Sequence, residues 1–275
     1  MILRSWLAAM VLMTGVSAQA ADNRLPAATG APVLSALAAQ QKDGLQQDGQ
    51  QKEGQQESAA PQPDPAQIQA DNIIRISGLT GLSEQARNLA QQILNEQAAP
   101  IGQQYDVVDR LAQQWAPAAL QQTLSSVLTA KLNDAQRTQL ERILSSATLE
   151  AVRHKELQAI SQQSGSDYRR YIDRLRANPV GEARLQLIRR LDQAMQFSAL
   201  LSATREQVYP QLEAVMTDWQ RPGNWQAALE QEVLEFLFYV HRSTPNRELE
   251  KVIGLYTRPE MQLWLSGVQK QLAAG

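Results

Sequence analysis

Apolar side chains recur at steps of three and four residues along the chain from residue 67 to the C-terminus. That spacing places the apolar positions on one face of an α-helix, and no period-two alternation is long enough to form a sheet. Leu, Ala, Gln, Glu and Arg, which favour helices, are abundant in the same stretch. We therefore predict an all-α fold of about eight to ten helices. Three of the predicted buried faces are Tyr105, Val108, Leu111 and Trp115; Leu120, Leu124, Val127 and Leu128; and Leu140, Ile143, Leu144 and Ala147.

Capping residues and prolines predict where these helices begin and end. Asn133, followed three residues later by Gln136, has the spacing of a capping box at a helix N-terminus. Pro117 and Pro210 lie inside apolar patterns, where the missing N–H group and the ring should break or kink a helix just before the proline.

A polar stretch at 161–167 is the best interior hinge of the helical region. It divides that region into an N-terminal half, 67–160, and a C-terminal half, 167–275. An offset of 109 residues lays 140–144 over 249–253 with similar residues at each position. The two halves are therefore either a degenerate duplication of one helical unit or two stretches that share only helical periodicity.

The N-terminus has the features of an export signal. Residues 1–20 begin with a basic residue at Arg4, continue through an apolar run, and end in the small-x-small pattern Ala18-Gln19-Ala20, which predicts cleavage after Ala20. The apolar run is about half of the roughly 20 residues that a membrane-spanning helix needs. Residues 21–66 are rich in Gln, Pro, Ala and Gly, and we expect a disordered tether or, alternatively, a partner-binding tract. These segments predict a periplasmic protein.

The composition excludes several chemistries. The 26 basic and 28 acidic residues give a net charge of -2, which argues against binding to nucleic acid. The chain has no Cys, and its two histidines, His154 and His241, are far apart in sequence, so we expect no metal site, no cofactor, and a surface or capping role for both imidazoles. No nucleophile elbow or phosphate-binding loop is present, so we predict that the protein is not an enzyme.

Glu235 is the one acidic residue whose surroundings suggest chemistry. It lies within the apolar run 233–240, and burial there would raise the pKa of its carboxyl group. Glu232, three residues earlier, could share the same helix face. Two such carboxyl groups in an open groove could cleave a glycosidic bond in the cell wall. An interhelical salt bridge is the other interpretation of the same residues.

Arginine is concentrated between residues 167 and 192, where the basic residues exceed the acidic ones by three. Such a surface could bind a lipid headgroup, a wall polymer or an acidic envelope protein, or it could be an ordinary solvated helix face. Our leading hypothesis is a non-enzymatic binding module, and the alternatives are a carrier that encloses an apolar ligand between the two halves and a weak hydrolase. The residues of the predicted binding surface are Arg169, Arg170, Arg174, Arg176, Arg184, Arg189 and Arg190.

Residues 255–261 read Leu-Tyr-Thr-Arg-Pro-Glu-Met, with an acidic and aliphatic run just before them. This segment resembles the Phe-Tyr-x-Ser-Pro-x-Gly turn of a family of exported bacterial helical proteins known as a domain of unknown function. Residues 74–81 also resemble the opening helix of that family. The resemblance implies a helical architecture and an exported protein, and it implies no catalytic residue. At this turn, Tyr256 is expected to cover a helix end and Pro259 to start the next helix.

Overall fold

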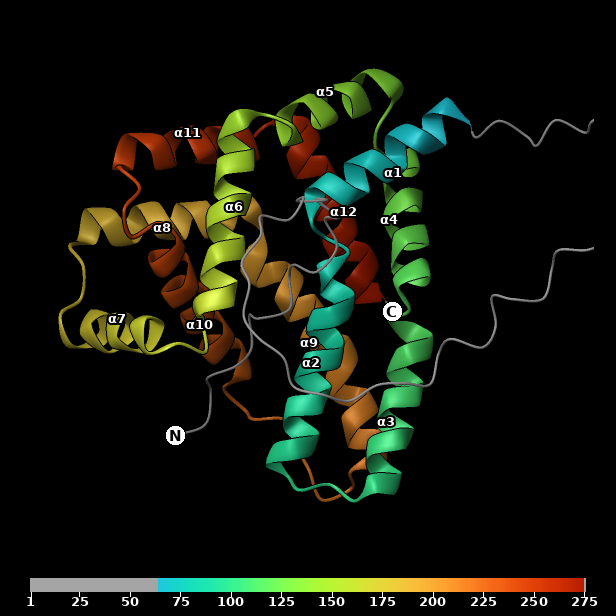
Figure 1. Cartoon of the computed structure of the whole chain (residues 1–275). Coiled ribbons are helices and arrows are strands. Elements are labelled where there is room, and N and C mark those ends of the chain that lie inside the picture. The colour runs from blue at the N-terminus through green and yellow to red at the C-terminus, as the bar shows by residue number, and fades with distance from the viewer. Residues whose placement is uncertain (1–63, 275) are drawn as a thin grey trace, which may run out of the picture. The chain divides into compact units, whose positions relative to one another are not determined.

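The computed structural model describes residues 64–274 (Figure 1). The predicted signal peptide, 1–20, and nearly all of the predicted tether, 21–66, lie outside these residues. The described part is all-α and contains no strand, which confirms the predicted fold class. None of its helices is both long enough and apolar enough to cross a membrane. The helices are α1 (Pro65–Ser77), α2 (Gly81–Glu96), α3 (Ile101–Gln114), α4 (Pro117–Lys131), α5 (Asp134–Leu144), α6 (Ala147–Gln162), α7 (Ser166–Ala177), α8 (Glu182–Met195), α9 (Phe197–Val215), α10 (Trp225–Val240), α11 (Asn246–Tyr256) and α12 (Pro259–Ala274).

Local sequence signals fix several of the helix ends. Asn133 Oδ1 accepts a hydrogen bond from the Gln136 amide, and Gln136 Oε1 accepts one from the Asn133 amide, both at 2.9 Å, so the predicted capping box is confirmed. Helix α4 begins at Pro117, as predicted. The prediction of eight to ten helices is low for residues 64–274. Two junctions are very short, because only two residues separate α5 from α6 and only Gln196 separates α8 from α9.

The expected helix break before Pro210 is wrong, because α9 continues through this residue. Pro210 and Glu206, whose carbonyl group loses its partner there, are both exposed. Water can therefore satisfy the carbonyl group. Val208 and Leu212 on either side of the proline are fully buried. Their packing holds the helix together where local sequence alone predicts its end.

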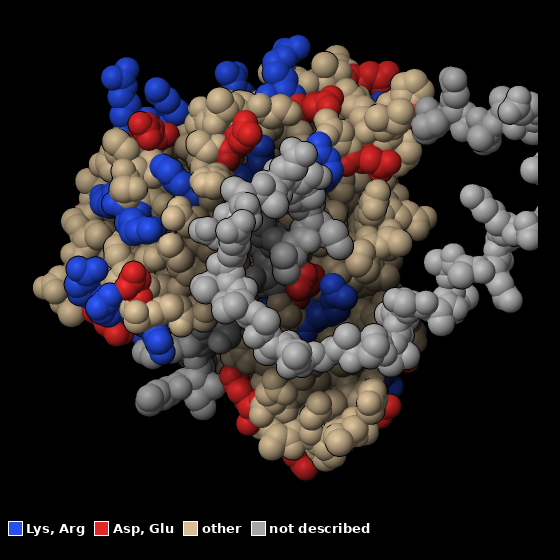
Figure 2. Space-filling view, viewed as in Figure 1, with Lys and Arg blue, Asp and Glu red and all other residues tan. Residues whose placement is uncertain are grey.

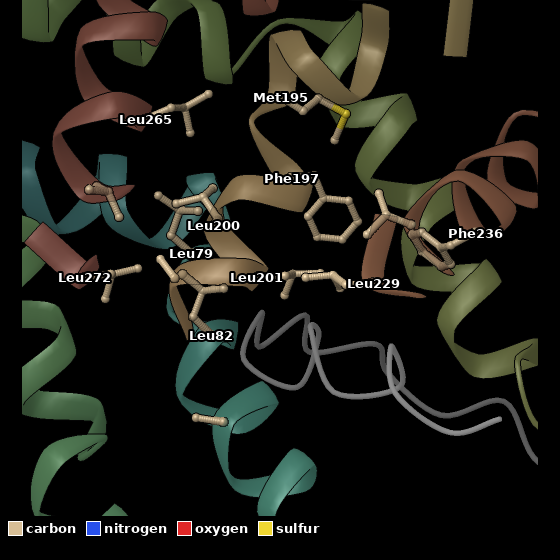
Figure 3. Packing of buried hydrophobic residues seen from close by; sticks show 14 of the residues in the cluster. Leu79, Leu82, Met195, Phe197, Leu200, Leu201, Leu229, Phe236, Leu265 and Leu272 are labelled. Carbon is tan, nitrogen blue, oxygen red and sulfur yellow. The ribbon is translucent and has the colours of Figure 1, made fainter. Parts of the chain in front are cut away.

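The two expected halves of the helical region share one hydrophobic core. Helix α2 packs against α9, and α4 packs against α12, so helices from both halves lie side by side. Figure 3 shows Leu82 of α2, Leu200 of α9 and Leu265 of α12 within this core. The hinge expected at 161–167 is the turn between α6 and α7.

Buried positions repeat at the predicted offset of 109 residues. Six matched pairs are buried in both copies, across α4 and α5 on one side and α10 and α11 on the other. The duplication itself stays a prediction. The pairs are Leu124 with Val233, Val127 with Phe236, Leu128 with Leu237, Leu140 with Leu249, Ile143 with Val252, and Leu144 with Ile253.

Helix α3 buries a different face from the one predicted. Leu111 and Trp115 are buried as expected, but Tyr105 is 72% exposed and Val108 is 48% exposed, while Val107 is fully buried in their place. Two apolar stripes lie next to each other on this helix. Helix α3 contacts α2 and α9, and these neighbours cover only the stripe that contains Val107 and Leu111.

Candidate functional site

The seven arginines of the predicted binding surface belong to two consecutive helices. Four are in α7 and three are in α8, and both helices pack against α10. Helix α7 is amphipathic, with Ile172 buried and its arginines on the opposite side. Figure 2 shows Lys and Arg side chains gathered where α7 and α8 lie.

Five of these arginines are exposed to solvent, and we call them the arginine face. Arg170 pairs with Asp167 on its own helix and also accepts, through its carbonyl oxygen, a 3.3 Å hydrogen bond from Arg174 Nε. The other four guanidinium groups form no ion pair with any residue between 64 and 274. The arginine face therefore offers unpaired positive charge. Its residues are Arg169, Arg170, Arg174, Arg189 and Arg190.

Arg176 does not belong to this free surface, because it holds Glu235. Its Nε and Nη2 atoms each donate a hydrogen bond of 2.7 Å to one carboxylate oxygen of Glu235. Gln231 donates a third hydrogen bond, of 3.0 Å, to the same carboxylate. These bonds to Glu235 raise the pKa of Arg176. Glu235 is 5% exposed, so its carboxylate is buried and fully occupied by an interhelical ion pair.

Glu232 is also ion-paired, with a different helix. Arg205 of α9 donates a 2.8 Å hydrogen bond to Glu232 Oε2. Burial raises the pKa of Glu232, and the charge of Arg205 opposes that change. Glu232 and Glu235 therefore bind arginines on α9 and α7 respectively. This arrangement offers no free acid–base pair for glycoside cleavage.

A small pocket lies beside Glu232, between α2, α9 and α10. Gln85 and Thr204 are among its lining residues. Gln85 Nε2 and Glu232 Oε1 are buried there and have no hydrogen-bond partner. The space open to the centre of a water molecule is about 10 Å³, which is enough for one water. This pocket has no room for an apolar ligand of the kind that a carrier would enclose.

Arg184 also has a structural role. Its Nη2 donates a 2.7 Å hydrogen bond to the carbonyl oxygen of His241, and its Nη1 donates one of 2.6 Å to Asn246 Oδ1. These bonds fasten α8 to the turn between α10 and α11. Partial burial lowers the pKa of Arg184. Of the seven predicted binding residues, Arg176 and Arg184 are therefore committed to internal contacts.

The two histidines lie in different environments. His154 is exposed, whereas His241 is fully buried at the C-cap of α10, so the expected surface role is wrong for His241 and the capping role is confirmed. Its Nδ1 lies 3.4 Å from Thr244 Oγ1, which also accepts a 2.9 Å hydrogen bond from Lys155. Burial, together with the charges of Lys155 and Arg184, lowers the pKa of His241 to about 3. Residues 64–274 contain no group of three side chains placed to hold a metal ion.

The tyrosines near the arginines anchor α7 to α10. Tyr168 and Tyr171 contact the ring of Tyr239 edge to face, with centroids 4.7 and 5.3 Å away. Tyr171 donates a 3.0 Å hydrogen bond to the Phe238 carbonyl oxygen, and Tyr239 donates one of 2.8 Å to Gln162. These rings belong to the helix packing. They are not free to stack against a ligand.

The turn that carries the family resemblance joins α11, which ends at Tyr256, to α12, which begins at Pro259. Gln262 Nε2 donates 2.7 Å hydrogen bonds to the carbonyl oxygens of Tyr256 and Ala194, so it links this junction to the end of α8. Gln196 in turn donates a 2.9 Å hydrogen bond to Gln262 Oε1. Sequence analysis missed this network, because glutamines far apart in the chain carry no local signal.

Two titratable groups meet beside the same turn. Burial raises the pKa of Glu156, in α6, to about 7, and Arg153 opposes that change. Burial also raises the pKa of Tyr256, and the charge of Glu156 raises it further. Tyr256 is half-buried, so it forms part of the packing around this junction.

Comparison with known proteins leaves this architecture without a match: no protein-family model, no curated protein and no solved structure is similar to the chain.

Proposed function

We propose that the protein is a non-enzymatic binding module that holds an anionic component of the cell envelope on its arginine face. One observation carries the proposal: four exposed guanidinium groups of α7 and α8 have no ion-pair partner within residues 64–274. A guanidinium group presents several N–H donors in a plane that matches a phosphate or a carboxylate. Clustered on two neighbouring helices, such groups favour an anionic partner over a neutral one.

The proposed compartment is the periplasm. Support comes from the signal-peptide pattern of residues 1–20 and from the resemblance of residues 255–261 to a family of exported helical proteins. Phosphate groups of lipids, phosphate or carboxylate groups of wall polymers, and acidic proteins are the anions that such a module would meet there.

The two other functions that the sequence left open have less support. A hydrolase would use Glu232 and Glu235, but each of these carboxylates is bound by its own arginine. A carrier would need an internal apolar cavity, whereas the pocket beside Glu232 holds about one water molecule. A binding surface requires neither of these features.

The experiment reverses charge on the arginine face and measures retention on anionic material. The variant combines Arg169→Glu, Arg174→Glu and Arg190→Glu. Binding is followed by sedimentation with vesicles that contain phosphatidylglycerol and, separately, with purified wall polymer. We expect wild-type retention that weakens with added salt, and loss of retention in the variant. The probe that retains the wild type identifies the source of the anion.

A matched control changes the net charge equally, elsewhere on the surface. It combines Arg87→Glu, Arg110→Glu and Arg142→Glu, which lie in α2, α3 and α5 and are all exposed. Retention of the control should stay close to that of the wild type. Equal losses in both variants would show that only net charge matters, and unchanged retention of the arginine-face variant would refute the proposal. Both variants should melt near the wild-type temperature, because surface substitutions change stability little.

A further inference from the structure

Exposed apolar side chains are concentrated on one helix. Within residues 64–274, five large apolar residues are exposed, and three of them lie on α3. Ile101, Tyr105 and Val108 are 71%, 72% and 48% exposed. Their spacing of four and three residues puts them on one side of the helix, and we call them the α3 stripe. Single exposed apolar residues are common in soluble proteins, but a contiguous group marks a surface that binds something.

The α3 stripe is too small to hold a separate protein by itself. Seven residues of helix span about 10 Å, so the stripe covers on the order of 100 Å². A stable complex usually buries about 800 Å² on each partner. A segment of the same chain needs far less contact, because the connection keeps it at an effective concentration on the order of 1 mM.

The chain contains one suitable segment before the described residues. Val33, Leu34 and Leu37 are three of the five branched aliphatic residues between positions 21 and 63, and they have helical spacing. No charged residue occurs from Leu25 to Gln41. We propose that residues 33–37 fold back and dock on the α3 stripe.

The connecting chain is long enough for this contact. Residues 38–63 comprise 26 residues, which reach roughly 85 Å when extended. From Asp64, the chain reaches α3 through α1, α2 and two short turns. The two helices have 13 and 16 residues, or about 20 and 24 Å. With the turns, that path is no longer than roughly 70 Å, so 33–37 can reach Ile101.

Charge favours this segment over a second copy of the protein. Asp109 follows Val108 directly and borders the α3 stripe, and Asp106 lies beyond it. Two copies pairing stripe on stripe in antiparallel orientation would bring these acidic borders together. An uncharged segment meets no such repulsion.

The test uses the absence of cysteine, which allows one nitroxide label at a chosen position. The chain from Ala21, carrying Ser35→Cys with the label, is prepared with ¹⁵N so that paramagnetic loss of amide signal reports proximity. We expect loss of signal in residues 101–109 of α3, and no loss on the arginine face. Moving the label to Ser58→Cys should move the loss away from α3. A spectrum in which α3 keeps its full intensity with the label at position 35 would overturn the proposal.

Two further samples separate the segment from other occupants. Tyr105→Glu should restore the α3 signals without lowering the melting temperature, because the side chain is exposed. A mixture of labelled ¹⁴N chains with unlabelled ¹⁵N chains should show no loss of signal. Loss in the mixture equal to that in the single chain would mean that a second copy occupies the stripe. Persistence of the loss in Tyr105→Glu would also contradict docking on this stripe.

Discussion

The contact between α4 and α12 makes a prediction that depends on one glycine. Gly267 is buried in α12, and a Cβ atom added there would lie 2.7 Å from Val127 Cγ1 and 3.2 Å from Lys131 Cγ. The Lys131 side chain can move away, but Val127 is 5% exposed and β-branched, so its rotamer is restricted. Gly267→Ala should therefore push α4 and α12 apart.

The expected change follows from two opposing effects. Alanine favours a helix by about 1 kcal/mol over glycine. Overpacking of a filled core costs about 1–3 kcal/mol. Gly267→Ala should thus lower the free energy of unfolding by about 1 kcal/mol. Gly254→Ala, in the exposed part of α11, meets no atom within 4 Å and should raise it by about 1 kcal/mol.

Urea unfolding followed by circular dichroism measures both free energies under the same conditions. A third protein combines Gly267→Ala with Val127→Ala, which removes the methyl group that the new Cβ would meet. The double variant should be more stable than the sum of the single changes by about 1 kcal/mol. If Gly267→Ala is as stable as Gly254→Ala, or if the double variant is simply additive, the close approach of α4 and α12 is wrong.

Three other predictions concern buried groups. Because burial raises the pKa of Glu156 to about 7, stability is lost as pH rises from 4.5 to 7, and Glu156→Gln should raise the unfolding free energy by about 3 kcal/mol at pH 8 but hardly change it at pH 4. Because the pKa of His241 is lowered to about 3, stability is lost as pH falls below 6.5, and the Glu156→Gln protein should lose about 2 kcal/mol between pH 7 and pH 5, while NMR shows a neutral His241 ring; constant stability would contradict this. Tyr256→Ala should cost about 3 kcal/mol and Tyr256→Phe much less, and a wild-type melting curve for the alanine variant would assign the turn to recognition instead of packing.

Local sequence signals predicted the helical class and the caps well, because both depend on residues a few positions apart. The Asn133–Gln136 capping box forms within four residues and could be predicted from spacing alone. The burial of α3 could not be predicted in this way. Its two apolar stripes are equally regular, and only the positions of α2 and α9 decide that Val107 is buried and Tyr105 exposed. Pro210 was misjudged for the same reason, because packing of its neighbours outweighs its local effect.

The candidate site shows the same limit in its charges. Sequence identifies a run of arginines, but it does not reveal which of them face a carboxylate from another helix. Arg176 and Glu235 are 59 residues apart, and they meet because α7 packs against α10. Arg184 is withdrawn in a similar way, by a carbonyl group 57 residues further along. The five remaining arginines are exposed because no acidic side chain of a neighbouring helix reaches them, so an anion that binds here needs to displace only the helix-internal partner of Arg170.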